Sequence, residues 1–296
     1  MKILVTGFPG QLAASFARMP VGSHAFEFAS RADIDVTDEA AVRRKVAAGA
    51  YDTIVNCAAY TAVDRAESEA DEAYLVNVAG PRNLAAAAAE TGSKLVHVST
   101  DFVFGGRDAS RPIPVDALHS PLSVYGRTKS EGEAEVRAIL GDRAMIVRTS
   151  WLHSVNGPNF VTTMLRLMGS RDSLRVVADQ VGSPTHVDTL SKTILGLLKA
   201  DACGTFHVTD SGVASWYDFA VGISEIASAK GILQKPITVE PIRTEDYPTP
   251  AARPSYSVLD TTRAASILEE SAPHWRTTLS ASLDDVQREI MNDRGI

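Results

Sequence analysis

Short apolar runs alternate with longer helical stretches through the first half of the chain. A helical pattern rich in alanine runs from about Asp71 to Glu90 and is stopped by Thr91-Gly92. Such alternation predicts a parallel sheet with helices on both of its faces. The predicted strands are Ile3–Val5, Phe26–Ala29, Thr53–Asn56, Leu95–Ser99 and Met145–Arg148.

The pattern becomes irregular after Arg148. We expect helices at Phe160–Met168 and Val187–Lys199 and a short strand at Arg175–Val177. Five prolines fall between Pro236 and Pro254, a density that no regular helix tolerates, so this stretch is predicted to be a loop. The second half is therefore expected to contribute a smaller lobe that shares an interface with the first.

Composition removes several classes of function. The formal net charge of −7 argues against a protein that binds nucleic acid, because such proteins display a basic surface. The chain has no apolar run long enough to span a membrane, and its N-terminus is typical of a first strand rather than a signal peptide, so we expect a soluble, cytoplasmic protein. The seven histidines and two cysteines have no metal-ligand spacing, so no metal site is predicted.

A glycine pattern follows the first predicted strand and leads into a predicted helix, Leu12–Arg18. Gly7 and Gly10 let the backbone approach a pyrophosphate, and Gln11 and Leu12 open a helix whose unpaired N–H groups attract an anion. Two glycines alone are weak evidence, since a tight turn needs them in any case. Their position at the first strand of an α/β alternation predicts a doubly wound Rossmann fold that binds a dinucleotide.

The residues at the end of the second predicted strand bear on the choice of cofactor. NAD-binding versions of this fold place an acidic residue there to hold the ribose hydroxyls, but this chain has Ser30-Arg31. Serine and arginine suit a 2′-phosphate, so we predict NADPH, with NADH possible. The alternative is that Arg31 is a solvated surface residue and that Asp33 or Asp35 supplies the acid.

The candidate catalytic groups are Thr100, Tyr125 and Lys129. Tyr125 and Lys129 lie four residues apart, so a helix places both on one face, where the ammonium is expected to lower the pKa of the phenol. A tyrosine tuned in this way can protonate the alkoxide that forms when a hydride reaches a carbonyl carbon, and the Thr100 hydroxyl can hold the carbonyl oxygen. A tyrosine and a lysine at this spacing often occur by chance; the glycine pattern and the Ser99-Thr100 strand end give the pair its meaning.

These three signals in this order resemble the extended short-chain dehydrogenase/reductase superfamily. Further segments along nearly the whole chain are similar to the dTDP-4-dehydrorhamnose reductase family in particular. They are residues 55–67 (VNCAAYTAVDRAE), 99–104 (STDFVF), 148–151 (RTSW), 179–185 (DQVGSPT), 216–219 (WYDF) and 247–254 (YPTPAARP).

The resemblance implies NADPH-dependent reduction of the C4 ketone of dTDP-6-deoxy-L-lyxo-4-hexulose to dTDP-L-rhamnose. It makes Tyr125 the proton donor, Lys129 the group that orders Tyr125 and the nicotinamide ribose, and Thr100 the group that positions the ketone. It adds the following residues: Asp35 and Val36 near the adenine, Ala58, Ala59 and Tyr60 along the cofactor, Asp101, Phe102 and Trp151 against the sugar, and Arg253 at the nucleotide diphosphate. Blander alternatives stay open, since the aromatic residues fit a core, Asp101 a turn, and Arg253 an ion pair with Asp246.

By the same resemblance, residues 1–150, with about 171–210, form the NADP-binding domain, and residues 151–170 and 211–296 form the sugar-nucleotide-binding lobe. Some family members hold magnesium between two subunits with acidic residues, but the corresponding positions here are Ser15, Asp188 and Asp285. This set makes a weaker site for a hard cation, so we doubt Mg²⁺ and expect a monomer or weak homodimer. The competing functions are another deoxysugar reductase or epimerase and a non-catalytic NADP-binding regulatory subunit.

Overall fold

The computed structural model describes residues 1–19, 24–105, 111–155, 157–235 and 237–293, and a six-stranded parallel sheet forms its centre. The strand order is β10-β5-β4-β3-β1-β2. The strands are β1 Lys2–Phe8, β2 Ala25–Ser30, β3 Thr53–Asn56, β4 Lys94–Thr100, β5 Ala144–Thr149 and β10 Gly204–His207. The five strands predicted in the first half are confirmed, and so is the doubly wound Rossmann fold. Sequence reasoning missed β10, a four-residue edge strand in which Phe206 is the only large apolar side chain.

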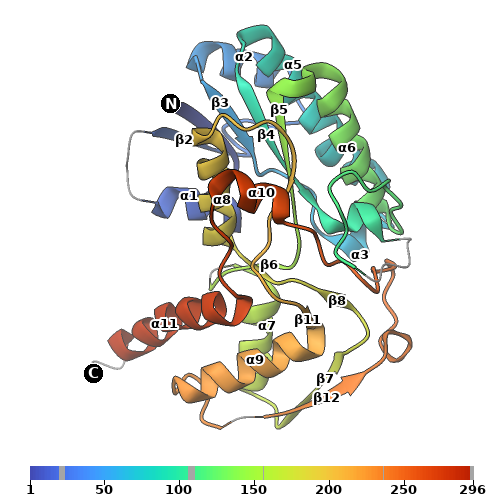
Figure 1. Ribbon diagram of the computed structural model, residues 1–296, viewed down its shortest axis with the longest axis vertical. Coiled ribbons are helices and arrows are strands. Elements are labelled where there is room, and N and C mark those ends of the chain that lie inside the picture. The colour runs from blue at the N-terminus through green and yellow to red at the C-terminus, as the bar shows by residue number, and fades with distance from the viewer. Residues whose placement is uncertain (20–23, 106–110, 156, 236, 294–296) are drawn as a thin grey trace.

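Helices cover both faces of this sheet (Figure 1). Neighbouring residues of β1 show how: Leu4 packs into the core under one helical layer, while Ile3 and Val5 pack into the core under the other. The layer on the Leu4 side contains α2 Glu39–Gly49, α5 Gly80–Thr91 and α6 Val124–Leu140; the opposite layer contains α1 Gln11–Arg18, α8 Val187–Lys199 and α10 Thr262–Leu268. The predicted helix at Val187–Lys199 is confirmed with the same bounds.

The long helix predicted from Asp71 to Glu90 is interrupted. The chain forms α4 Ala70–Tyr74, then one π-helical turn, η1 Leu75–Ala79, and then α5, which ends as predicted with Gly92 in the left-handed conformation. Pro81 explains the interruption, because proline has no N–H for the helical ladder and its ring collides with the carbonyl four residues earlier. The wider turn removes that collision and turns Asn77 toward α6.

A smaller lobe has its own apolar core below the sheet in Figure 1. Helices α7 Phe160–Met168, α9 Trp216–Ala229 and α11 Trp275–Asp293 pack together around Phe219, beside a two-stranded parallel sheet. That sheet pairs β7 Ser173–Val177 with β12 Thr238–Ile242. Two further pairs join the lobe to the sheet region: β8 Val181–Gly182 with β11 Ala214–Ser215, and β6 Leu152–His153 with β9 Thr185–His186.

The prediction of a loop between Pro236 and Pro254 is wrong over β12. Pro241 lies inside that strand, where a two-stranded sheet leaves one edge unpaired and proline needs no partner for a missing N–H. The remainder is irregular apart from a 3₁₀ turn at Thr244–Asp246, and Pro236 itself lies outside the described residues. The remaining short elements are α3 Val63–Ala66 and 3₁₀ turns at Asp101–Phe104 and Gly141–Arg143.

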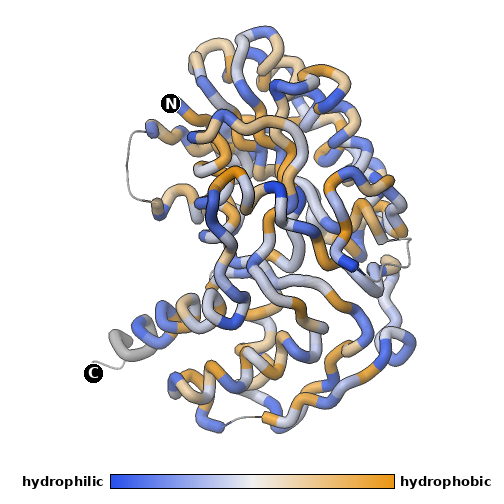
Figure 2. Tube along the Cα trace, in the orientation of Figure 1, coloured by the Kyte–Doolittle hydropathy of each residue, from blue (hydrophilic) through white to orange (hydrophobic). Residues whose placement is uncertain are grey.

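Apolar positions mark much of the central strands and alternate with polar positions along the helices (Figure 2), and several polar residues are buried as well. Within the residues that the structure describes, no helix is both long and apolar enough to cross a membrane.

Candidate active site

A cleft of about 1070 Å³ opens at the carboxyl edge of the parallel sheet. This is the edge at which open α/β sheets bind ligands, and the volume suits a large one. Most predicted site residues line it: Gly7, Gly10, Gln11, Leu12, Arg31, Asp35, Val36, Ala58, Ala59, Tyr60, Thr100, Asp101, Phe102, Tyr125, Lys129 and Trp151. Ser30 and Arg253 are not among the lining residues.

The glycine loop exposes the start of α1 to this cleft. Gly7 has φ +80°, and a Cβ there would lie 2.7 Å from the backbone nitrogen of Ala58, so the turn requires glycine. No side chain caps the first turn of α1, and that turn contains no acidic residue. Its N–H groups therefore face the cleft with the partial positive charge of a helix N-terminus, which fits a pyrophosphate.

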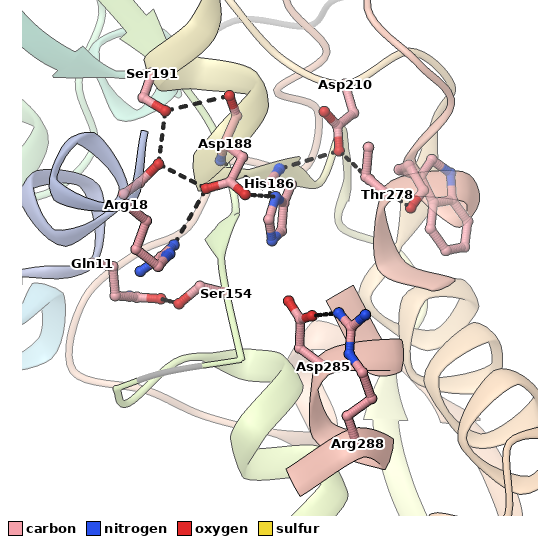
Figure 3. A network of polar contacts seen from close by, with 12 residues as sticks. Gln11, Arg18, Ser154, His186, Asp188, Ser191, Asp210, Thr278, Asp285 and Arg288 are labelled. Carbon is pink, nitrogen blue, oxygen red and sulfur yellow. Dashed lines mark hydrogen bonds and ion pairs between the residues drawn. The ribbon is translucent and has the colours of Figure 1, made fainter. Parts of the chain in front are cut away.

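Gln11 connects the glycine loop to the smaller lobe. Its Oε1 accepts hydrogen bonds from Ser154 Oγ at 2.8 Å and from Asn159 Nδ2 at 3.0 Å (Figure 3 shows Gln11 and Ser154). Asn159 also caps α7, so one residue orders both a helix and the cofactor loop. Sequence reasoning missed Ser154 and Asn159. The asparagine before a helix indicates a cap, but nothing in the spacing indicates its contact with Gln11.

The side chains of Ser30 and Arg31 have different surroundings, and only Arg31 lines the cleft. The Ser30 hydroxyl donates to Asp33 Oδ2 at 2.6 Å within a tight turn. Arg31 lines the cleft and is largely exposed, with ion pairs to Asp35 at 3.2 Å and to Glu72 at 3.6 Å. Exposed pairs of this kind are weak, so the guanidinium is free to turn toward an anion. Asp35 bonds to Thr37 as well, and these contacts lower its pKa.

The three candidate catalytic residues meet in the cleft. Ser123 caps α6 and accepts a hydrogen bond from the Gly126 nitrogen, which begins the helix next to Tyr125. Lys129, one turn later, donates from Nζ to the Val98 carbonyl oxygen of β4 at 2.7 Å. Thr100 terminates β4, and its hydroxyl donates to Asp101 Oδ1 at 3.0 Å. Strand β4 thus positions Thr100, and helix α6 positions Tyr125 and Lys129.

The prediction that Lys129 lowers the pKa of Tyr125 is wrong in this structure. Burial raises the pKa of Tyr125 to about 12; a hydrogen bond with Thr100 opposes that rise, and the charge of Asp101 adds to it. Burial also lowers the pKa of Lys129 to about 8. The reason is desolvation, which acts on both groups because α6 is packed tightly onto the sheet. The phenol is therefore fully protonated near neutral pH.

The sugar-side residues combine packing with exposure to the cleft. Trp151 has φ +47° and stacks on Trp216 with ring centroids 3.6 Å apart. Phe102 meets the Tyr125 ring edge-on at 5.4 Å, and burial raises the pKa of Asp101 to about 6. Trp151 is thus both a packed aromatic residue, as the blander alternative holds, and a wall of the cleft.

Arg253 has a different partner from either of those predicted. Its guanidinium forms a two-pronged pair with Asp64, at 3.0 Å and 2.8 Å, and donates to Thr249 Oγ1 at 2.6 Å. The Asp246 alternative is wrong, because that carboxylate instead accepts from the backbone nitrogen of Arg243. The pair joins the proline-rich segment to the start of α3 next to the cleft. Sequence spacing could not predict it, since 189 residues separate the two partners.

The three positions considered for a magnesium ion, Ser15, Asp188 and Asp285, are engaged within this chain, and Figure 3 labels Asp188 and Asp285. Ser15 Oγ donates to Asp188 Oδ1 at 2.8 Å, and Arg18 pairs with the same oxygen at 3.2 Å. Asp285 pairs with Arg288. A guanidinium beside each carboxylate opposes a cation there, and no group of three possible ligands occurs among the described residues. This donor set does not fit a divalent cation.

The fold and this site define a class of protein. The chain has a Rossmann sheet with a glycine loop after strand β1 and a Tyr-x-x-x-Lys helix beside the end of strand β4. This is the arrangement of short-chain dehydrogenases/reductases. The family model described as RmlD substrate binding domain matches residues 1–288.

Comparisons with known proteins narrow the class. The dTDP-4-dehydrorhamnose reductase of Aggregatibacter actinomycetemcomitans is 38% identical over 94% of this chain and 97% of its own length. A crystal structure of the Clostridium acetobutylicum dTDP-4-dehydrorhamnose reductase superposes with a TM-score of 0.91 at 40% identity, covering 97% of this chain and 100% of the other. The Bacillus anthracis enzyme of the same name, in complex with NADP, gives a TM-score of 0.90 at 35% identity, covering 96% and 99%. The chain belongs to the dTDP-4-dehydrorhamnose reductase family and is an oxidoreductase.

Proposed function

We propose that this enzyme reduces the C4 ketone of dTDP-6-deoxy-L-lyxo-4-hexulose to dTDP-L-rhamnose with NADPH. The observation that carries the proposal is a single cleft that contains both the open N-terminus of α1 and the group Thr100, Tyr125 and Lys129. Family membership supports the substrate. Residues 1–150 with about 171–210 would hold NADPH, residues 151–170 and 211–296 the sugar nucleotide, and the protein would act as a monomer or weak homodimer.

The chemistry divides between the cofactor and the side chains. Bound NADPH supplies the hydride for C4 of the sugar. The Thr100 hydroxyl holds the ketone oxygen, and Tyr125 donates its phenolic proton to that oxygen as negative charge develops. Lys129 lies one helical turn from Tyr125 and lines the same cleft, where it would order the phenol and the nicotinamide ribose, while solvent returns the proton to Tyr125. Because burial keeps Tyr125 protonated at rest, the donor is loaded before substrate arrives.

The other residues would bind and orient. The first turn of α1, with Gly7 and Gly10, would hold the pyrophosphate, and Gln11 would keep that loop fixed to the smaller lobe. Asp101, Phe102 and Trp151 would form the sugar site. Trp151 is well suited to this role because Trp216 holds its ring rigidly by stacking. Arg253 would reach the diphosphate only by giving up part of its pairing with Asp64.

The decisive experiment follows NADPH absorbance when the purified enzyme meets dTDP-6-deoxy-L-lyxo-4-hexulose, with NADH in parallel and the product identified by mass and NMR. Oxidation that yields dTDP-L-rhamnose is expected. If the protein is folded and binds NADPH but does not oxidise it with this sugar, the substrate is another deoxysugar or the role of the protein is regulatory. NAD retained through purification, with interconversion of sugar epimers, would instead indicate an epimerase.

Replacement of Arg31 tests the choice of cofactor. Arg31→Asp removes the proposed partner of the 2′-phosphate and places a carboxylate where it repels that group, so we expect the preference to move from NADPH toward NADH. The measurement is kcat/KM with each cofactor. Arg166→Asp makes the same change of charge on α7, outside the cleft, and should leave the ratio unchanged. Unchanged selectivity in Arg31→Asp would mean that Arg31 is only a surface residue.

A further inference from the structure

A buried ion pair joins the catalytic helix to the sheet directly behind the active site. Glu133 of α6 and Arg148 of β5 have side chains that are 0% and 1% exposed. Arg148 Nε donates to Glu133 Oε1 at 2.9 Å, and the same guanidinium donates to Oε2 at 2.7 Å. Such parallel bonds fix both partners in direction as well as distance.

The surroundings keep both charges in place. Arg148 also donates to the Val115 carbonyl at 2.9 Å and to His119 Nε2 at 2.7 Å, and its guanidinium lies 4.8 Å from the Phe104 ring centre. Burial alone would raise the pKa of Glu133, but the hydrogen bond and charge of Arg148 bring it to about 2. The pair is therefore ionised at every pH at which the enzyme would work.

Glu133 is one helical turn beyond Lys129, on the same face of α6. The other titratable groups facing Lys129 are Cys57 after β3 and His97 on β4. Burial raises the pKa of Cys57 to about 12 and holds the pKa of His97 well below its usual value, so both are neutral near pH 8. On α6 itself Tyr125 is neutral there too. Glu133 is thus the negative charge available to this ammonium among the described residues.

We propose that Glu133 is a positioning residue for the reductase reaction, whose carboxylate anchors α6 to β5 through Arg148 and provides the counter-charge for the buried ammonium of Lys129. The inference rests on the proposed function. A purely structural role would not need charge, since a buried ion pair replaced by packed apolar side chains often leaves stability unchanged or higher. The need for a counter-charge to the Lys129 ammonium explains why a charged carboxylate is buried at position 133.

The sign of the effect follows from the positions of the charges. Activity that needs the Lys129 ammonium falls as the pH rises through the pKa of Lys129, which burial has already lowered to about 8 while Glu133 opposes that fall. Removing the carboxylate lowers this pKa further, so the alkaline limb of the pH profile moves to lower pH. Removing Arg148 leaves the carboxylate, still held by Arg137 at 2.7 Å, and does not move the limb downward.

Two variants that break the same pair therefore separate the two roles. Glu133→Gln and Arg148→Met are measured for kcat/KM against pH and for the dissociation constant of NADPH against pH. We expect the alkaline limb of Glu133→Gln to fall by roughly one pH unit, the size of a close-charge effect. We expect the alkaline limb of Arg148→Met to lie at the same pH as in the wild-type enzyme or at a higher pH. Equal shifts in the two variants, or no shift in Glu133→Gln, would overturn the proposal.

The double variant Glu133→Gln/Arg148→Met covers the case in which a single variant does not fold, because it removes both charges of the pair and so leaves neither partner buried without the other. Its alkaline limb should still lie below that of the wild-type enzyme, and an unmoved limb would overturn the proposal. The NADPH-binding profile separates this result from the proposed function. A wild-type enzyme that fails to reduce the sugar still reports the ionisation of Lys129 through the pH dependence of cofactor affinity.

Discussion

Tyr125→Phe is expected to lower kcat by roughly 100- to 10,000-fold, the contribution of a positioned general acid, while NADPH binding stays nearly unchanged. The substitution removes one oxygen from a ring that is already buried and keeps its edge-on packing with Phe102 at 5.4 Å. Hydride transfer then produces an alkoxide with no proton donor beside it. The measurement is single-turnover oxidation of NADPH together with fluorescence titration of cofactor binding.

Tyr51→Phe provides the matched control. Tyr51 is also buried, with its pKa raised by burial and by Glu27, but it precedes β3 at the opposite edge of the sheet. Loss of its hydroxyl should therefore leave kcat unchanged. Full activity in Tyr125→Phe would remove the assignment of the proton donor, and an equal loss in Tyr51→Phe would show that any buried phenol matters for folding alone.

The central sheet is the part of the fold that local sequence predicts well. Buried parallel strands are continuous apolar runs, so Ile3–Val5 and Met145–Arg148 were recognisable without tertiary information. Strand β10 was not, because an edge strand needs fewer apolar residues and Gly204–His207 resembles a turn. The π-helical turn at Leu75–Ala79 depends on how Pro81 is accommodated beside α6, which local propensity does not encode.

The site divides in the same way. Motif residues such as Gly7 and Tyr125 were found because their chemistry depends on local spacing, which a parallel sheet converts into a shared cleft. The partner of Arg253 was not found, because tertiary folding alone brings Asp64 to it. The pKa of Tyr125 was predicted with the wrong sign. Charge spacing along a helix is visible in sequence, whereas the desolvation that outweighs it depends on the packing of the whole layer.

That close packing leads to the second large expected effect. Gly132→Ala should destabilise the protein by about 1–3 kcal/mol, although alanine normally stabilises a helix relative to glycine by about 1 kcal/mol. A Cβ at Gly132 would lie 2.1 Å from the backbone oxygen of Asn77 in η1, so α6 or the π turn must move. Asn77 also bonds to Tyr60 and Thr128, and the shift should therefore reduce NADPH affinity as well.

Gly196→Ala in α8 isolates the cause of that destabilisation. A Cβ there would meet the Leu268 side chain at 3.0 Å, a flexible neighbour that can turn away, whereas the Asn77 carbonyl cannot. Urea unfolding should show Gly196→Ala unchanged or stabilised by up to about 1 kcal/mol, with Gly132→Ala moved in the opposite direction. If Gly132→Ala were as stable as Gly196→Ala, α6 would not be held against η1 at this distance. The close approach that fixes Tyr125 and Lys129 in the cleft would then be absent from the protein.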